Sequence, residues 1–149
     1  HKLKIILLYV THDPHDALGF ADETLILDTG KIIEKGSSKS IYYQPRKFNT
    51  AILTGYCNWL SVENFHSSAN LHRIKNKFLV RPDQVKLFPD EQDQVYLAII
   101  DKIEFHGFYQ LIYLNLKNLG IITGIQLTNQ DSFVIGQEVP ICFKPHRST

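Results

Sequence analysis

The chain has 149 residues, of which 44% are hydrophobic and 21% are charged, with 16 Lys+Arg against 15 Asp+Glu. This composition is typical of a globular protein and excludes an intrinsically disordered chain. The formal net charge of +1 argues against a protein that binds the nucleic-acid backbone, and the longest apolar run, Ile5 to Val10, is far too short to cross a bilayer.

The chain begins with His1 and contains no methionine. Because a translated protein begins with Met, we expect this chain to be part of a longer protein. Cys57 and Cys142 lie far apart and form no CxxC motif, so two ordinary thiols are favoured, with a single long-range disulfide left open.

The first predicted element is the apolar run IILLYV at residues 5–10. A continuous run of this length predicts a strand buried on both faces, as in a parallel sheet. Asp13 is then expected to cap a short helix with Pro14 at its first position. A buried parallel strand needs neighbours on both sides, so without them we expect residues 5–10 to be exposed, disordered, or paired with another chain.

Short elements separated by turn residues follow. The turn Asp28-Thr29-Gly30 predicts a tight hairpin, and Ser37 or Ser38 is expected to cap a second helix. The predicted elements are strands at 24–27 and 31–34 and helices ending at Pro45 and at Gly55.

Strand patterns recur at short intervals after Trp59. Regular short strands joined by turns predict a small barrel or sandwich. We therefore expect an α/β part at residues 1–59 and an all-β domain at residues 60–149. The predicted strands are residues 60–64, 78–81, 95–105, 109–116, 121–127 and 139–143, with His106-Gly107 as the turn between the two long ones.

Thr11-His12-Asp13 is the sharpest candidate for a functional site. It follows the predicted buried strand, where open α/β sheets place their ligand-binding groups. The His12 imidazole can contact a phosphate or an attacking water. In the alternative interpretation, Thr11 and Asp13 only cap the helix and His12 is a surface histidine. His12 and His15 have no third ligand nearby in the sequence, so no metal site is expected.

The remaining motifs of the sequence do not predict a binding or catalytic site. The basic cluster at residues 72–77 favours a solvated turn or charged edge strand over a single-strand nucleic-acid site, and no nucleic-acid partner is expected. Gly30-Lys31 is not a phosphate loop, because Leu25 and Ile32 stand where that motif needs Gly and Ser or Thr. The sequence therefore contains no complete catalytic apparatus.

Residues 9–45 resemble the last part of the ATP-binding subunit of ABC importers. Residues 48–60 are similar to the linker helix found in importers that carry an additional C-terminal domain, with Gly55 and Asn58 at familiar positions. Residues 78–87 and 136–145 resemble the TOBE domain, a small OB-like barrel. The motifs that carry the resemblance are Thr11-His12-Asp13, Asp16-Ala17, Ala21-Asp22, Gly30-Lys31, Tyr42 to Pro45 and Arg81-Pro82-Asp83.

The resemblance implies an α/β remnant of a P-loop (RecA-like) ATPase domain followed by an all-β OB-like (TOBE) barrel. It implies that His12 is the switch histidine, which contacts the γ-phosphate of ATP and helps to hold the attacking water. The phosphate loop, signature motif and acidic Mg²⁺ site would lie upstream, so ATP and Mg²⁺ belong to the longer protein. The chain alone is expected to be inactive, without a bound cofactor. Pro14-His15 departs from the family, which has Gln at the first of these positions.

The same resemblance implies two partners, a second copy of the chain and membrane permease subunits. It implies a peripheral location at the cytoplasmic face of the bacterial inner membrane. The family serves sugars, polyamines, ferric iron, sulfate and molybdate, and the short β-domain favours ferric iron or a polyamine. The alternative function is a binding module, without catalysis, whose barrel takes a small anion such as molybdate or sulfate.

Overall fold

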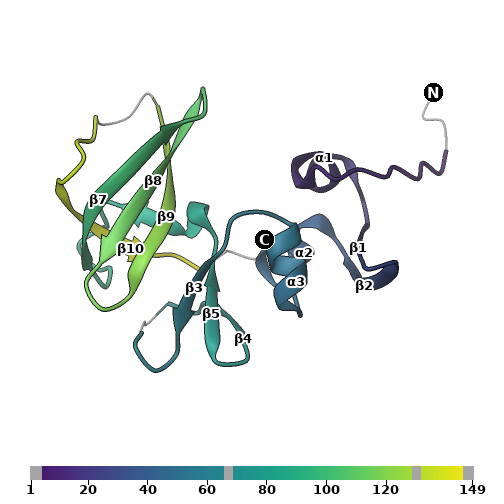
Figure 1. Cartoon of the computed structure of the whole chain (residues 1–149), viewed down its shortest axis with the longest axis horizontal. Helices are drawn as coiled ribbons and strands as arrows, with labels where there is room; N and C mark the ends of the chain where they lie inside the picture. The colour runs from purple at the N-terminus through teal and green to yellow at the C-terminus, as the bar shows by residue number, and fades with distance from the viewer. Residues whose placement is uncertain (1–4, 66–68, 129–131, 146–149) are drawn as a thin grey trace. The chain divides into compact units, whose positions relative to one another are not determined.

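The computed structural model describes residues 5–65, 69–128 and 132–145. The chain divides between Gly55 and Tyr56 into two compact units (Figure 1). None of the described helices has the length and hydropathy needed to span a bilayer.

The N-terminal unit contains short helices and one hairpin. Asp13 caps the first helix as predicted, because its Oδ1 accepts a hydrogen bond from the His15 N–H at 2.8 Å. Ser37 caps the second helix in the same way. The elements are α1 (Pro14–Phe20), β1 (Thr24–Asp28), β2 (Lys31–Gly36), α2 (Ser38–Tyr43) and α3 (Phe48–Leu53).

The hairpin turn between β1 and β2 lies where the sequence predicts it. Thr29 and Gly30 have positive φ angles of 48° and 75°, as a two-residue turn between twisted antiparallel strands requires. Glycine adopts such an angle without strain, which explains Gly30, whereas the β-branched Thr29 adopts it at a cost.

The predicted buried strand at Ile5–Val10 is wrong for this structure. These residues have no strand assignment, and their side chains are 57% to 99% exposed. The described part of the chain provides no parallel strand to pair with them. The exposure expected in the absence of sheet neighbours is therefore confirmed.

The C-terminal unit is built on a five-stranded antiparallel sheet in the order β6-β10-β7-β8-β9. Its edge strands β6 and β9 approach each other, so the sheet curls into a nearly closed barrel (Figure 1). Gly124 allows this approach, since a Cβ there would lie 3.3 Å from Val85 Cγ1 and 3.5 Å from Leu87 Cδ1. The strands are β6 (Val85–Leu87), β7 (Tyr96–Phe105), β8 (Tyr109–Leu116), β9 (Gly120–Leu127) and β10 (Glu138–Phe143).

A second sheet of three strands, β3-β5-β4, accompanies the barrel. The basic cluster at residues 72–77 lies in the edge strand β4 and its turn to β5, in agreement with the charged-edge interpretation. The remaining elements are β3 (Asn58–Ser61), β4 (His72–Ile74), β5 (Lys77–Val80) and the 3₁₀ turn η1 (Pro82–Gln84).

The barrel interior forms one continuous apolar core. Val139, Ile141 and Phe143 of β10 are buried in it, as their alternation predicts. The Phe65 ring packs edge-on against Phe143, with ring centres 4.9 Å apart. The remaining members of this core are Leu60, Leu71, Val80, Val85, Leu87, Ala98, Ile100, Ile112, Leu114, Leu116 and Ile122.

Candidate functional site

The segment Thr11-His12-Asp13 directly precedes α1. Thr11 Oγ1 accepts a hydrogen bond from the Asp13 N–H at 3.0 Å, and Asp13 in turn caps the helix. Both side chains are therefore used on the local backbone, as the capping interpretation predicts. The Tyr9 hydroxyl donates to Asp16 Oδ2 at 3.2 Å and joins the preceding segment to the helix.

His12 is exposed between these two capping residues. Its imidazole makes no hydrogen bond or ion pair with the side chains that the structure describes. An exposed imidazole can donate or accept a hydrogen bond, so the geometry suits contact with a ligand carried by another part of the protein. Nowhere in the described ranges do three His, Cys, Asp or Glu side chains gather in an arrangement suited to a metal ion.

The N-terminal unit exposes an unusual amount of apolar surface. In addition to residues 5–10, the side chains of Phe20, Leu27, Ile32 and Ile52 are at least 60% exposed. Large amounts of exposed apolar surface mark interaction sites in soluble proteins. The surface chemistry of this unit is therefore that of a contact face.

Asn58 connects the second sheet to the edge of the barrel. Its Nδ2 donates to the Thr123 carbonyl and its Oδ1 accepts from the Thr123 N–H, both at 2.7 Å. One side-chain amide thus pairs with β9 as a neighbouring strand would. Because both groups are buried, this bond pair substitutes for strand pairing at the open side of β9.

Arg81 anchors the start of the C-terminal unit from inside. Its side chain is fully buried, and Nη1 donates to the Tyr56 carbonyl and to Cys57 Sγ, each at 3.0 Å. Burial raises the pKa of the Cys57 thiol, and the guanidinium charge opposes that rise only in part. The thiol therefore stays protonated at neutral pH and is poorly suited to nucleophilic chemistry.

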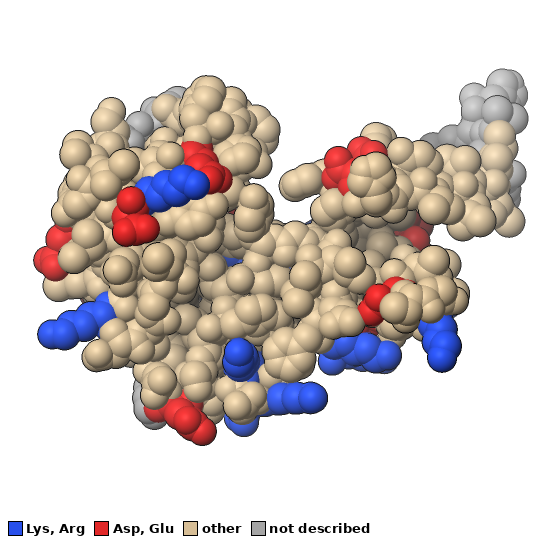
Figure 2. Space-filling model, viewed as in Figure 1, with Lys and Arg blue, Asp and Glu red and all other residues tan. Residues whose placement is uncertain are grey.

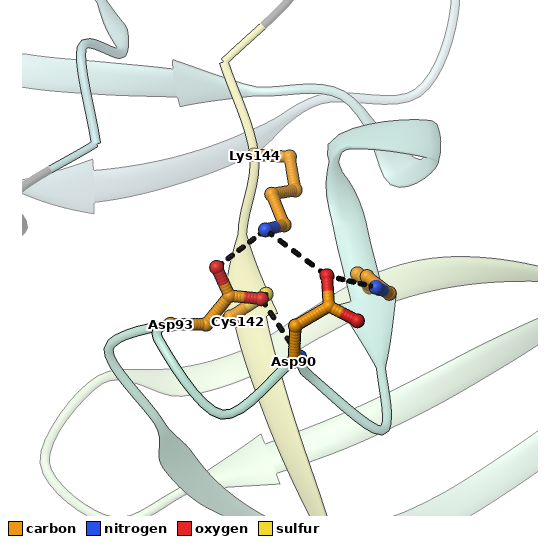
Figure 3. Close-up of polar contacts among 5 residues, drawn as sticks. Asp90, Asp93, Cys142 and Lys144 are labelled. Carbon is orange, nitrogen blue, oxygen red and sulfur yellow. Dashed lines mark hydrogen bonds and ion pairs between the residues drawn. The ribbon is translucent and has the colours of Figure 1, made fainter.

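Five polar side chains form a cluster where the loop before β7 crosses β10 (Figure 3). Lys144 pairs with Asp93 and lies 3.8 Å from Asp90, which also pairs with Lys86 at 2.8 Å. The Cys142 thiol donates to Asp93 Oδ2 at 3.3 Å. The hydrogen bond from Lys144 lowers the pKa of Asp93 to about 2, whereas burial raises the pKa of Cys142 to about 11.

These charges satisfy one another, so the cluster holds the loop and offers no reactive group. Cys57 and Cys142 are both free, which confirms the prediction of ordinary thiols. No local sequence pattern indicates this cluster, because Asp93 and Lys144 are 51 positions apart. The hydrogen bonds of Asn58 to Thr123 could not be predicted either, although Asn58 is one of the positions that match the family pattern.

An open groove of about 500 Å³ lies at the seam where β6 and β9 meet. Its one lysine, Lys86, is already paired with Asp90, and Asp83 adds a negative charge to the wall. This charge distribution does not suit an oxyanion. The groove is lined by Asp83, Val85, Lys86, Leu87, Phe88, Ile125 and Gln126.

The chain is similar to known proteins in two ways. The family model described as the TOBE domain matches residues 78–148. Among curated proteins, the chain is 26% identical over 151 residues to the Fe(3+) ions import ATP-binding protein FbpC of Serratia marcescens, covering 94% of this chain and 44% of that protein.

Two further relatives carry different names. The chain is 28% identical to the sulfate/thiosulfate import ATP-binding protein CysA of Mesostigma viride, over 72% of this chain and 33% of the relative. It is 26% identical to the spermidine/putrescine import ATP-binding protein PotA of Clostridium acetobutylicum, over 78% of this chain and 37% of the relative.

The nearly closed antiparallel barrel and the family match together define a TOBE domain in the C-terminal unit. The chain as a whole is homologous to the C-terminal region of ABC importer ATP-binding proteins, which confirms the resemblance found in the sequence. It spans less than half the length of the relatives that it matches.

Proposed function

We propose that this chain supplies the end of the nucleotide-binding domain and the TOBE barrel of an ATP-hydrolysing ABC importer subunit. In this proposal residues 1–59 are the nucleotide-binding part with its linker helix, and residues 60–149 are the barrel. The observation that carries the proposal is the exposed His12, which stands directly before a capped helix in a chain homologous to import ATPases.

His12 acts in this proposal as the switch histidine. Its imidazole contacts the γ-phosphate of ATP and helps to hold the attacking water, so that it stabilises charge in the transition state. ATP brings the phosphoryl group and Mg²⁺ neutralises its charge. The sequence of this chain offers His12 alone as a candidate phosphate contact, so groups outside it bind most of the nucleotide. The isolated chain is therefore inactive.

The exposed apolar surface of the N-terminal unit supports this proposal. Residues 5–10 have the composition of a strand buried on both faces, yet the described residues leave them exposed. In the longer protein, strands of the nucleotide-binding domain pair with this segment and cover it. Phe20, Leu27 and Ile32 then face the same domain.

The partners in this proposal are a second copy of the subunit and membrane permease subunits. The subunit sits peripherally at the cytoplasmic face of the bacterial inner membrane. The transported substrate is ferric iron or a polyamine, a choice supported by relatives named for Fe(3+) ions and for spermidine/putrescine. The barrel provides dimer contacts or regulates transport.

The proposal is tested by His12→Ala in the longer protein. We expect ATP turnover to fall by about 10²- to 10³-fold, as when a single transition-state hydrogen bond is removed, while nucleotide binding persists. His15→Ala is the matched control, because His15 is also exposed and lies within the first turn of α1. Turnover near the unmodified level in His12→Ala would contradict the proposal.

A further inference from the structure

The barrel has an open strand edge at the seam between β6 and β9. None of the described strands pairs with the outer side of β9 (Figure 1). In an antiparallel ladder, successive residues direct their N–H and C=O alternately to the two sides of the strand. Just beyond β9, the Thr128 N–H donates to the Phe108 carbonyl at 3.1 Å, which continues the ladder with β8. The even-numbered residues of β9 therefore bond to β8, and the odd-numbered residues direct their N–H and C=O toward the seam.

This edge already binds one carboxamide. Thr123 is odd-numbered, and its N–H and C=O exchange two hydrogen bonds of 2.7 Å with the side-chain amide of Asn58. The edge thus pairs with a group that carries its own donor and acceptor side by side. Ile125, two positions further along β9, directs the same two backbone groups outward, and beside it lies the seam groove.

The groove has the size and the walls of a small-molecule site. Its volume of about 500 Å³ lies in the range of such sites, and Val85, Leu87 and Phe88 give it apolar walls. The seam closes at Gly124, where a Cβ would lie 3.3 Å from Val85 Cγ1. Because an added strand could not continue past this point, the groove suits a compact ligand better than an extended peptide.

Phe88 is held at the groove in an unusual conformation. It is 43% exposed and has a φ angle of 53°, which is rare for a bulky residue. Its N–H donates to the Pro140 carbonyl at 3.0 Å, and its ring stacks on Phe133 with ring centres 6.0 Å apart. Strained backbone that is fixed in this way clusters at ligand sites. A planar ligand can stack on the exposed part of the Phe88 ring.

The charges beside the groove favour a ligand without negative charge. Lys86 pairs with Asp90, whereas Asp83 adds a carboxylate to the wall. Most of the visible surface is uncharged, and its acidic and basic side chains are scattered (Figure 2). No strong field of one sign therefore draws an anion to the groove, and a neutral ring is favoured over a phosphate or an oxyanion.

We propose that the seam groove binds a small neutral ring with a carboxamide or lactam edge, in which an N–H donor lies beside a C=O acceptor. Free pyrimidine bases and nicotinamide share this chemistry. The ligand edge pairs with the N–H and C=O of Ile125 as Asn58 pairs with Thr123, and the ring stacks on Phe88. The proposal gives the barrel a ligand of its own and does not depend on the role of His12.

An NMR titration of the whole chain with uracil and with nicotinamide, followed at each backbone amide, tests the proposal. We expect saturable shifts at Ile125 and Phe88, with dissociation constants on the order of 1 mM for ligands of this size. The Thr123 N–H is the internal control, because it is already bonded to Asn58 and should shift less than that of Ile125. The ring that binds more tightly identifies the source of the ligand.

Matched ligands test the hydrogen-bonding edge. Uracil methylated at both ring nitrogens and nicotinamide methylated twice at its amide keep their rings but have no N–H donor. We expect both to bind at least about tenfold more weakly than the unmethylated rings, because the backbone groups of Ile125 lose their partner.

A matched pair of variants tests the stacking surface. Phe88→Gly removes the ring at a position whose φ angle suits glycine, and it should weaken binding of both rings about tenfold. Phe20→Ser is the control, because Phe20 is 84% exposed but belongs to the N-terminal unit, and it should bind as the unmodified chain does. Thermal unfolding verifies that each variant is folded, and the methylated ligands decide the question if Phe88→Gly is not.

Three results would overturn the proposal: no saturable shift at Ile125 with either ring, equal binding of the methylated and unmethylated rings, or unchanged binding in folded Phe88→Gly. The titration contains no ATP, so its failure is separate from a failure of the His12 test.

Discussion

The two units of the chain differ most in how they treat their apolar residues. The C-terminal unit gathers 15 buried apolar residues in one barrel core, whereas the buried apolar residues among the described part of the N-terminal unit are Ile26, Ile41 and Ala51. At the same time the N-terminal unit leaves residues 5–10 exposed. The barrel thus has the core of an independent domain. The N-terminal unit instead exposes apolar side chains of the kind that a complete domain buries in its interior.

The largest expected effect comes from the barrel core. Ile141→Ala in β10 removes a fully buried side chain from an inner strand of the sheet and should lower the free energy of unfolding by about 2–5 kcal/mol. Ile6→Ala in the N-terminal unit removes a side chain that is 99% exposed and should change it by less than about 0.5 kcal/mol. Urea unfolding measures the free energy of unfolding of both variants. Equal losses of stability in the two would contradict the difference between the two units.

A smaller loss is expected at the junction of the two sheets. Asn58→Ala leaves the buried N–H and C=O of Thr123 without their partner and should cost about 1–3 kcal/mol for each group that finds no water. Asn115→Ala, at an exposed position of β8, is the control and should be nearly neutral. If the two variants unfold at the same urea concentration, Asn58 does not close the edge of β9.

The smallest expected effect concerns the charge cluster at Asp93. Its pKa of about 2 in the folded chain is below the usual value near 4, so ionised Asp93 stabilises the fold at neutral pH. This contribution is fully present above about pH 4 and is lost as the pH falls through about 2. Asp93→Asn should therefore flatten the dependence of stability on pH in this window.

Acid unfolding followed by circular dichroism measures this dependence. Asp101→Asn is the comparison variant, because Asp101 is exposed at the bulge of β7 and makes no ion pair with a described residue. A pH profile that steepens in Asp93→Asn, or changes equally in both variants, would show that Lys144 does not hold the loop through Asp93.

Local signals predicted much of this fold. The caps at Asp13 and Ser37, the Thr29-Gly30 turn and the long strands β7, β8 and β9 all follow from short-range patterns, and each lies close to its predicted position. Such features depend on neighbouring residues, so one sequence contains enough information to find them.

Other features depend on distant partners and could not be predicted. Strands β4 and β6 have three residues each, too few for a periodic pattern. The buried Arg81 and the bond pair of Asn58 require knowledge of tertiary neighbours, and the closing of the seam requires Gly124 to meet β6. Residues 5–10 show the converse, since their composition predicts a sheet that the described chain does not contain.

The central claim, that this chain is one part of an ATP-hydrolysing importer subunit, is tested most directly by the DNA sequence upstream of the codon for His1. The account predicts a reading frame that continues upstream and encodes Gly-x-x-x-x-Gly-Lys-Ser/Thr and then a Ser-Gly-Gly signature, within about one domain length. An initiator codon close to His1, with neither motif encoded, would contradict it.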